Sequence, residues 1–324
     1  MKAIAHSSYG SVDGLELREI DTPEIGEDEV LVRVHAAGVD RGVWHVMTGL
    51  PYPIRLAGYG LRAPKAPGVL GSDVAGVVEG VGKEVTAFQE GDEVFGVAEG
   101  SYAEHAIARE DKLASKPTNL TFEQAAAVPT SAATALHAVR DKGQVRPGDK
   151  VLVIGASGGV GTYAVQIAKS FGAEVTGVCS ATKVDLVRSI GADHVIDYTA
   201  DDFADGRHRY DVIVDIGGNS SLSRLRRALT PKGTLVITGG ETDGRWLGGV
   251  DRQLRAQMLS PFVGQKLGTF IATVTTDDLI VLKDLIEAGR IKPIVDRTFS
   301  LDEVPKAISY LIEGHVRGKV VIAV

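Results

Sequence analysis

The chain contains a single cysteine, Cys179, among 324 residues. One cysteine excludes an internal disulfide, and we expect Cys179 to be a small buried hydrophobe at a strand end. A structural zinc lobe needs several cysteines, and a catalytic zinc of the alcohol-oxidising type needs Cys and His ligands together. Four histidines lack metal-ligand spacing and are expected to be packed or surface residues: His35, His45, His105 and His137. The sequence therefore predicts no zinc and disfavours metal-assisted alcohol oxidation.

The chain also lacks long apolar runs and an excess of basic over acidic residues. No apolar stretch approaches the length of a membrane helix, and Met1-Lys-Ala-Ile-Ala lacks the apolar core of a signal peptide. The formal net charge is −7, and the short Arg224–Arg227 pattern is typical of a solvated helix face. We expect a cytoplasmic protein with neither nucleic acid nor membrane as its partner. A 44% hydrophobic content is enough for a proper core, and 324 residues can form two domains.

The most informative segment is Lys150-Val-Leu-Val-Ile-Gly-Ala-Ser-Gly-Gly-Val-Gly161 in mid-chain. Its apolar run predicts a buried parallel strand, and the glycines that follow allow a tight turn into a helix over 162–171. Backbone amides at the start of that helix then point at an anion, for which a dinucleotide pyrophosphate is the expected group. Ala156 stands where the first glycine of G-x-G-x-x-G is expected, so the fingerprint is a variant.

The pattern of strand and helix continues beyond this turn. Ala173–Val178 predicts the second strand of a βαβ unit of about thirty residues. The remaining strands are expected at 194–197, 211–215, 233–240 and 268–272, with helices at 183–190 and 221–229. Six strands that alternate with helices predict an α/β fold with a doubly wound parallel sheet of Rossmann type.

The end of the second strand bears on the choice of cofactor. An NAD site usually places Asp or Glu there to hold the ribose 2′-hydroxyl, whereas this chain has Cys179-Ser-Ala-Thr-Lys183. Hydroxyl groups and a lysine suit a 2′-phosphate, and the repelling carboxylate is missing. The sequence favours NADP(H), although Ser180 could instead cap the next helix with Lys183 solvated.

The first part of the chain has a different pattern of residues, without alternating strands and helices. Short alternating strands separated by Gly and Pro turns are expected at 1–5, 15–19, 29–34, 76–81 and 101–107, which predicts an irregular β-barrel. Pro51–Gly71 is expected to be a loop. The last fifty residues, with helices at 277–289 and 301–313 and strands at 295–299 and 318–324, are expected to return to the barrel. We assign residues 1–122 and 273–324 to a substrate domain and residues 123–272 to a nucleotide domain.

The order of a barrel, a mid-chain Rossmann unit and a short return, together with several short sequence motifs, resembles the medium-chain dehydrogenase/reductase superfamily over essentially the whole chain. The motifs are Ala36-Ala-Gly-Val-Asp40, Gly71-Ser-Asp-Val-Ala-Gly76, Gly91-Asp-Glu-Val-Phe-Gly96, Gly155-Ala-Ser-Gly-Gly-Val-Gly161 and Gly318-Lys-Val-Val-Ile322. Within the superfamily the chain resembles the zinc-independent quinone oxidoreductase branch. The resemblance implies a GroES-like barrel domain beside the Rossmann domain, NADP(H) as cofactor, and a homodimer that pairs through the sixth-strand edge, here Gly268–Val274.

The resemblance also implies positions for the cofactor site. Ser157, Gly158, Gly159 and Val160 would cradle the pyrophosphate, and Ser180, Lys183 and Tyr198 would surround the 2′-phosphate and the adenine ribose. The adenosine and nicotinamide sides would be lined by residues that follow three later strands: Gly217, Gly239, Gly240, Phe270, Ile271 and Ala272. Thr134 would lie near the nicotinamide amide.

Without a Lewis acid, the chemistry easiest to support is hydride donation from the nicotinamide to a small-molecule electrophile, a quinone or an α,β-unsaturated carbonyl. Donors must then hold the developing enolate oxygen. Asp40, Trp44, Tyr52 and Tyr59 are the candidates for the substrate site, with core packing as the alternative for the aromatics. The family often has Asn at position 40. Because an ionised Asp40 would oppose an enolate, we expect it to orient the cofactor or a loop.

Two other functions stay open at this point. An enoyl-thioester reductase would need a basic patch for a coenzyme A or phosphopantetheine tail, for which Arg41, Arg55 and Arg62 are the candidates. A regulatory protein that binds NADPH without turnover is the alternative from another class. The fold alone does not choose among them.

Overall fold

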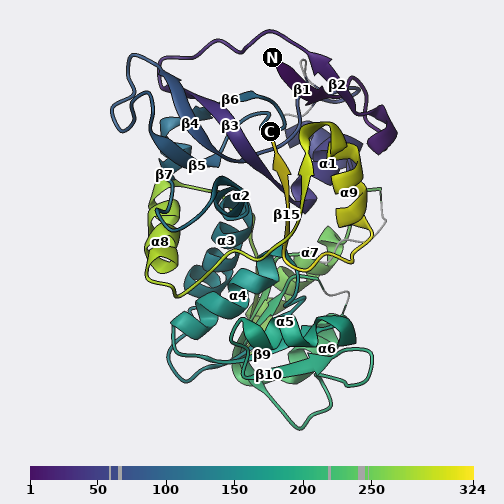
Figure 1. Ribbon diagram of the computed structural model, residues 1–324. Coiled ribbons are helices and arrows are strands. Elements are labelled where there is room, and N and C mark those ends of the chain that lie inside the picture. Colours follow the sequence, from purple (N-terminus) through teal and green to yellow (C-terminus); the bar gives the residue numbers. More distant parts are fainter. Residues whose placement is uncertain (58–59, 65–67, 218–219, 240–244, 247) are drawn as a thin grey trace. The chain divides into compact units, whose positions relative to one another are not determined.

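The computed structural model describes residues 1–57, 60–64, 68–217, 220–239, 245–246 and 248–324. Its contacts divide the chain into two compact units. Figure 1 labels many of the helices and strands. Unit 1 comprises Met1–Ala133, Thr273–Gly289 and Pro293–Val324, and unit 2 comprises Thr134–Ala272 and Arg290–Lys292. The boundary between the units therefore falls at 133/134 rather than at the 122/123 expected from the sequence.

Unit 2 is built on a six-stranded parallel sheet in the order β10-β9-β8-β11-β12-β13. The strands are β8 (Lys150–Ile154), β9 (Glu174–Cys179), β10 (His194–Asp197), β11 (Tyr210–Asp215), β12 (Leu229–Ile237) and β13 (Lys266–Thr269). After its first residue β8 is buried throughout, as its uninterrupted apolar run predicts. The strand order reverses between β8 and β11, which is the switch point where such sheets bind ligands. The predicted doubly wound α/β fold is confirmed.

Helices connect these strands. They are α4 (Gly159–Ser170), α5 (Val184–Ser189), α6 (Leu222–Ala228) and α7 (Val250–Leu259), and they pack against β8 and β9, β9 and β10, β12, and β13 respectively (Figure 1). Because βαβ crossovers are right-handed, α4 and α5 cover one face of the sheet and α6 and α7 the other. Leu152, Ile213, Leu225 and Leu235 belong to the buried core that results.

Unit 1 is mainly β. The two-stranded sheet of β1 (Lys2–Ala5) and β2 (Glu16–Glu19) stands beside a larger sheet in the order β14-β15-β3-β4-β5-β7, with β6 also paired to β3. These strands are β3 (Glu29–Val39), β4 (Asp73–Val81), β5 (Glu93–Val97), β6 (His105–Arg109), β7 (Leu113–Ser115), β14 (Val295–Ser300) and β15 (Lys319–Ala323). The last two come from the last thirty residues: β15 pairs with β3 and β14 pairs with β15, so the predicted return to the first domain is confirmed.

Helices of unit 1 complete its core. They are α1 (Arg41–Thr48), α2 (Phe122–Ala126), α8 (Thr276–Glu287) and α9 (Val304–Ile312). Helix α3 (Pro129–Leu136) crosses the boundary and continues in unit 2 as a π-helical segment, His137–Lys142. The core joins both ends of the chain, since Ile4, Val32 and Tyr102 pack in one cluster with Ile308 and Ile322.

Several predicted boundaries are wrong. The helix expected over 162–171 begins at Gly159, because the turn ends sooner than the glycines suggested. The sixth strand is Lys266–Thr269 instead of 268–272, so Phe270, Ile271 and Ala272 follow the strand. The loop expected over 51–71 contains a 3-10 helix, Tyr52–Ala57, and α1 and α7 were not predicted.

Candidate functional site

The glycine turn after β8 has the close packing that a dinucleotide fingerprint requires. Gly155 has φ of +86°, a left-handed conformation that favours glycine, and its amide donates to the Val178 carbonyl at 3.1 Å. A Cβ added to Gly161 would lie 2.0 Å from the Gly155 carbonyl oxygen. Glycine at 161 therefore lets α4 approach the turn, which is the role of the last glycine in the motif.

The first turn of α4 is open to an anion. Gly158 is the N-cap residue, and it has no side chain that could satisfy the first amides of the helix. Among the residues that the structure describes, a Cβ added at Gly158 would meet only the Gly155 carbonyl oxygen, at 3.6 Å, so these residues leave the space beside the turn open. Gly159 and Val160, at the start of the helix, and the buried Ser157 in the turn all surround this open end. The residues fit a pyrophosphate bound by backbone amides and the helix dipole.

The candidate 2′-phosphate residues meet at the ends of β9 and β10. The Tyr198 amide donates to the Cys179 carbonyl at 3.1 Å, so Tyr198 follows β10 directly beside Ser180. Lys183 lies in the short 3-10 helix Ala181–Lys183. Burial, with the charge of Asp197 added, raises the pKa of the Cys179 thiol, while the cations Lys183 and Arg188 oppose that rise. The charges of Asp197, Lys183 and Arg188 therefore all act at the end of β9.

One carboxylate stands close to this group, which the sequence argument did not anticipate. Asp197 ends β10 and is the register partner of Cys179. Its Oδ1 accepts hydrogen bonds from the Thr199 amide at 3.0 Å and the Thr199 hydroxyl at 2.8 Å. These bonds engage the carboxylate in its own turn, and no carboxylate follows β9 itself.

Three predicted glycine positions come together at the carboxyl ends of the central strands. A Cβ added to Gly155 would lie 2.9 Å from the Gly217 nitrogen, and one added to Gly239 would lie 2.1 Å from the Ile216 carbonyl oxygen. The turns after β8, β11 and β12 are therefore in backbone contact. Gly240 and Tyr59, also predicted, lie outside the residues that the structure describes.

The segment after β13 contacts a residue that the sequence analysis did not choose. The Phe270 and His137 rings lie with their centroids 6.1 Å apart, and His137 follows directly on the helix that carries Thr134. Ile271 is 94% exposed. Ring contacts between segments so far apart in sequence have no local pattern, so only the fold reveals His137.

The substrate candidates lie in unit 1. Asp40 is the N-cap of α1, and its Oδ1 accepts a 2.6 Å hydrogen bond from the Gly42 amide. Trp44 is half-buried against the core, with the Arg41 guanidinium 5.1 Å from its ring centroid. The Tyr52 ring is 5.0 Å from the Arg55 guanidinium, which also donates to the Gly49 carbonyl at 2.9 Å.

A buried ion pair near Asp40 was also not predicted. Lys319 Nζ lies 3.3 Å from Asp73 Oδ2, and both side chains are at least 98% buried. Asp73 Oδ1 accepts from the Thr130 amide at 3.0 Å, in the first turn of α3. Burial raises the pKa of Asp73, Lys319 opposes that rise and the charge of Asp40 adds to it. The pair fixes the start of the helix that carries Thr134.

The cysteine and the histidines considered as zinc ligands have other surroundings. In the described part of the chain, no three His, Cys, Asp or Glu side chains gather in a way that could hold a metal ion. The Cys179 thiol is buried with a raised pKa, which keeps it protonated at neutral pH. His45 Nδ1 donates to the Leu50 carbonyl at 2.6 Å, and His105 Nε2 lies 2.6 Å from Glu79 Oε2.

Among the described residues, no helix is long and apolar enough to cross a membrane.

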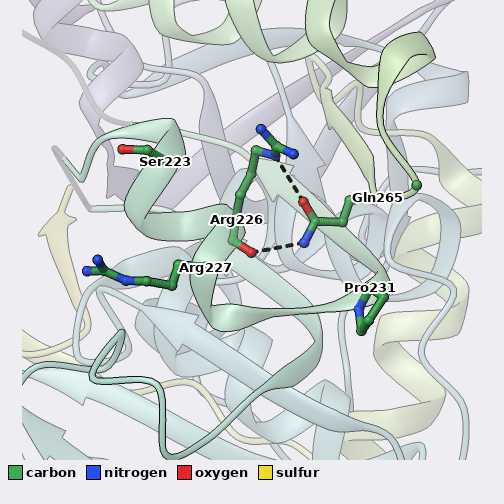
Figure 2. A pocket seen from close by; sticks show the side chains of 6 residues that line it. Ser223, Arg226, Arg227, Pro231 and Gln265 are labelled. Atoms are coloured by element: carbon green, nitrogen blue, oxygen red, sulfur yellow. Dashed lines mark hydrogen bonds between the residues drawn. The ribbon is translucent and has the colours of Figure 1, made fainter.

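A surface depression of about 450 Å³ lies elsewhere in unit 2. Figure 2 shows it between the last turn of α6 and the segment before β13, with Arg226 Nε donating to Gln265 Oε1 at 3.0 Å. It is lined by Ser223, Arg226, Arg227, Pro231, Gly264 and Gln265. Pro231 lies near the amino end of β12, and Gly264 and Gln265 directly precede β13, whereas parallel sheets bind dinucleotides at the carboxyl ends. The depression is therefore not the cofactor site.

Comparisons with known proteins agree with this geometry. Residues 26–118 match the family model described as alcohol dehydrogenase GroES-like domain, and residues 190–322 match the one described as zinc-binding dehydrogenase. A 2-methylene-furan-3-one reductase of Solanum lycopersicum is 34% identical, over 99% of this chain and 79% of that protein. An NADPH-dependent alkenal/one oxidoreductase of Arabidopsis thaliana is 36% identical over the same shares of the two chains.

A solved structure covers the entire chain. The quinone oxidoreductase from Coxiella burnetii aligns with 100% of this chain and 99% of its own, at 28% identity and a TM-score of 0.87. The similarity extends over both units rather than over the common nucleotide fold alone.

Proposed function

This chain belongs to the medium-chain dehydrogenase/reductase superfamily, in its quinone oxidoreductase-like branch, and is an oxidoreductase of a nicotinamide cofactor; from this premise we propose that it reduces a quinone or an α,β-unsaturated carbonyl with NADPH. The observation that carries the proposal is the open amino end of α4 behind the turn at Gly155, at the switch point of the sheet. Similar proteins are named as reductases of a methylene-furanone, of alkenals and enones, and of quinones.

The preference for NADPH is the first finer point of the proposal. Ser180, Lys183 and Tyr198 lie around the ends of β9 and β10, where the ribose of the cofactor is expected. A lysine and hydroxyl groups suit the doubly charged 2′-phosphate, and the Asp197 carboxylate is hydrogen-bonded to its own turn. NADH would gain nothing from the lysine charge.

The reaction is proposed to proceed without zinc. The one cysteine is in unit 2 at the end of β9, and the chain offers it no partner ligands among the described residues. The bound nicotinamide supplies a hydride. The chain must then hold the substrate and donate hydrogen bonds to the enolate or hydroquinone oxygen that develops. Trp44 and Tyr52 are proposed to line the substrate, and Asp40 to hold the loop that starts α1.

The arginines considered for a thioester tail have other contacts. Arg55 contacts two aromatic rings, Tyr9 and Tyr52, and donates to a backbone carbonyl, while Arg41 lies over Trp44. Arg62, the third candidate, is exposed. The contacts of Arg41 and Arg55 therefore do not favour the enoyl-thioester reductase over the enone or quinone reductase.

A homodimer through the edge of the six-stranded sheet is also proposed. β13 is the edge strand, and α7 and the following 3-10 helix pack against it. Three large apolar side chains near this edge are mostly exposed: Met258 at 73%, Phe262 at 85% and Ile271 at 94%. An exposed apolar group of this kind marks an interface, and a second copy of the chain can cover both the edge and the apolar side chains.

Isotope transfer tests the reaction proposed. The protein is supplied with NADPH deuterated at the nicotinamide C4 and a simple enone, and the deuterium is located in the product by NMR. We expect deuterium on the β-carbon of a saturated ketone. Deuterium on the carbonyl carbon of an allylic alcohol would contradict the proposal, because it would indicate carbonyl reduction. The same assay after exhaustive chelation is expected to give the same rate.

A further inference from the structure

Arg252, in the first turn of α7, connects three segments of unit 2. Its Nη1 donates to Asp215 Oδ2 at 2.7 Å and to the Ser220 carbonyl at 3.0 Å, and its Nη2 donates to the Gly239 carbonyl at 2.9 Å. Asp215 is the last residue of β11 and is fully buried, while the side chain of Arg252 is 13% exposed. One guanidinium therefore joins the end of β11, the segment after it, and the segment after β12.

Stability alone is a poor explanation for this arrangement. Burying two charges costs desolvation energy, and well-packed apolar residues often replace a buried ion pair without loss. A planar guanidinium adds something that they cannot, because its fork of donors holds several acceptors in fixed positions. Here two of the three acceptors are backbone carbonyls outside regular structure. The contacts of Arg252 therefore set backbone positions.

The backbone that Arg252 holds lies beside the glycine turn. Gly239 packs on Ile216, and Gly217 packs on Gly155, so the segments after β8, β11 and β12 form one contact group. The Thr238 amide donates to the Asp215 carbonyl at 3.0 Å, which ties the same strand ends a second time. A shift of Gly239 or Ser220 would thus change the wall of the cofactor site at the switch point.

We propose that Arg252, anchored by Asp215, is a positioning residue that holds the backbone of Ser220 and Gly239 in place for the dinucleotide. The inference rests on the proposed binding of NADPH at this edge of the sheet. Arg252 acts through the backbone of Ser220 and Gly239 and needs no contact with the cofactor. Its loss weakens cofactor binding and leaves the hydride step, once the site is saturated, nearly unchanged.

Arg252→Lys is the deciding variant. Lysine keeps a positive charge for Asp215 but lacks the fork that holds two carbonyls as well. We expect a folded protein with a Kd for NADPH raised about tenfold and a kcat within about threefold of the unchanged protein. A tenfold change in Kd corresponds to the loss of about one hydrogen bond. Arg255→Met on the same helix is the matched control, since Arg255 is 73% exposed in a surface pair with Asp251.

A second variant removes the charges together. Asp215→Leu/Arg252→Met leaves no single buried charge, so it avoids the unfolding expected of Arg252→Met alone. For the double variant we expect near-normal thermal stability and a Kd for NADPH raised at least tenfold. The Kd of Arg252→Lys is expected to lie between those of the double variant and the unchanged protein. Binding by either folded variant with the unchanged Kd would overturn the proposal, as would a kcat loss with no change in Kd. Failure of the proposed function shows separately, as lack of NADPH binding by the unchanged protein.

Discussion

Lys183 is the residue on which cofactor choice depends most. Its charge reaches the end of β9, where the 2′-phosphate is expected, and a charge-assisted hydrogen bond contributes about 1.5–3 kcal/mol. For Lys183→Ala we expect kcat/KM for NADPH to fall about ten- to hundredfold with little change for NADH. Lys232→Ala, at an exposed position of β12, is the control. An equal loss for both cofactors would contradict the assignment.

Asp40 has two separable properties, its capping oxygen and its charge. Asn caps a helix as well as Asp, whereas Ala costs about 0.5–2 kcal/mol of stability. We therefore expect Asp40→Asn to keep both folding stability and turnover, and Asp40→Ala to unfold at lower denaturant concentration. Chemical denaturation and steady-state kinetics measure the two effects. A large loss of cofactor-saturated turnover in Asp40→Asn, with normal NADPH binding, would assign Asp40 to substrate chemistry instead.

His35 gives the protein a defined dependence on pH. Its ring stacks on Phe122 at 4.3 Å, and burial, with Arg33 second, lowers its pKa below 6.5, against Glu93 and Glu123. Between the lowered pKa and 6.5 the unfolded chain binds more protons, so the free energy of unfolding rises with pH there.

We expect the thermal midpoint to fall as pH drops from 7 through this window, and His35→Phe to lose part of that dependence. His315→Phe, at an exposed position, is the control and keeps the full dependence. Identical pH profiles for His35→Phe and the unchanged protein would show that His35 is not responsible.

At the scale of elements, two glycines of one turn have different tasks. A Cβ at Gly161 would collide with the Gly155 carbonyl at 2.0 Å, and overpacking of this kind costs about 1–3 kcal/mol. A Cβ at Gly158 would meet no described atom closer than 3.6 Å but would stand in the space left for the anion. Gly161→Ala is thus expected to lose more stability than Gly158→Ala, which removes a favourable N-cap glycine, and Gly158→Ala is expected to lose NADPH affinity.

Thermal unfolding and a cofactor titration separate these outcomes. Equal stability losses in the two variants would mean that the turn is packed uniformly and has no open anion site. Unchanged NADPH affinity in Gly158→Ala would place the pyrophosphate elsewhere.

Elements differed in how well the sequence predicted them. β8 and β11 are largely buried apolar runs bounded by turns, and β10 is a short half-buried run at the sheet edge, so their existence and their order along the chain could be predicted. Helix α7 was not predicted, because it is polar overall and follows Gly249, which has no side chain to signal a helix start. The contact of Arg252 with Asp215 joins residues 37 positions apart, and such a tertiary contact leaves no local signal.

At the scale of the whole molecule, the exposed apolar side chains near β13 predict the oligomeric state. We expect the protein to have twice the mass of the 34.2 kDa chain by light scattering. Phe262→Asp is expected to give a folded monomer, because a charge cannot be buried unpaired at an interface. Ile280→Asp, an exposed apolar position on α8, is the control and stays dimeric. A monomeric unchanged protein would contradict the proposal.

The division into units was only partly predictable from composition. The change from short strands to Rossmann units indicated two domains, but α3 crosses the boundary with its first turn fixed by Asp73 and Lys319. That pair joins β4, near the beginning of the chain, to its last strand. The predicted cytoplasmic location and the lack of nucleic-acid and membrane partners stay predictions.

The central claim is that this chain transfers a hydride from NADPH to a quinone or an activated alkene. The most direct measurement is the oxidation of NADPH, with NADH in parallel, against a naphthoquinone, a benzoquinone, an α,β-unsaturated aldehyde, an enone and an enoyl-CoA. We predict turnover of quinones or enones with a clear preference for NADPH. Tight NADPH binding with no turnover of any acceptor, or a preference for NADH, would contradict the account.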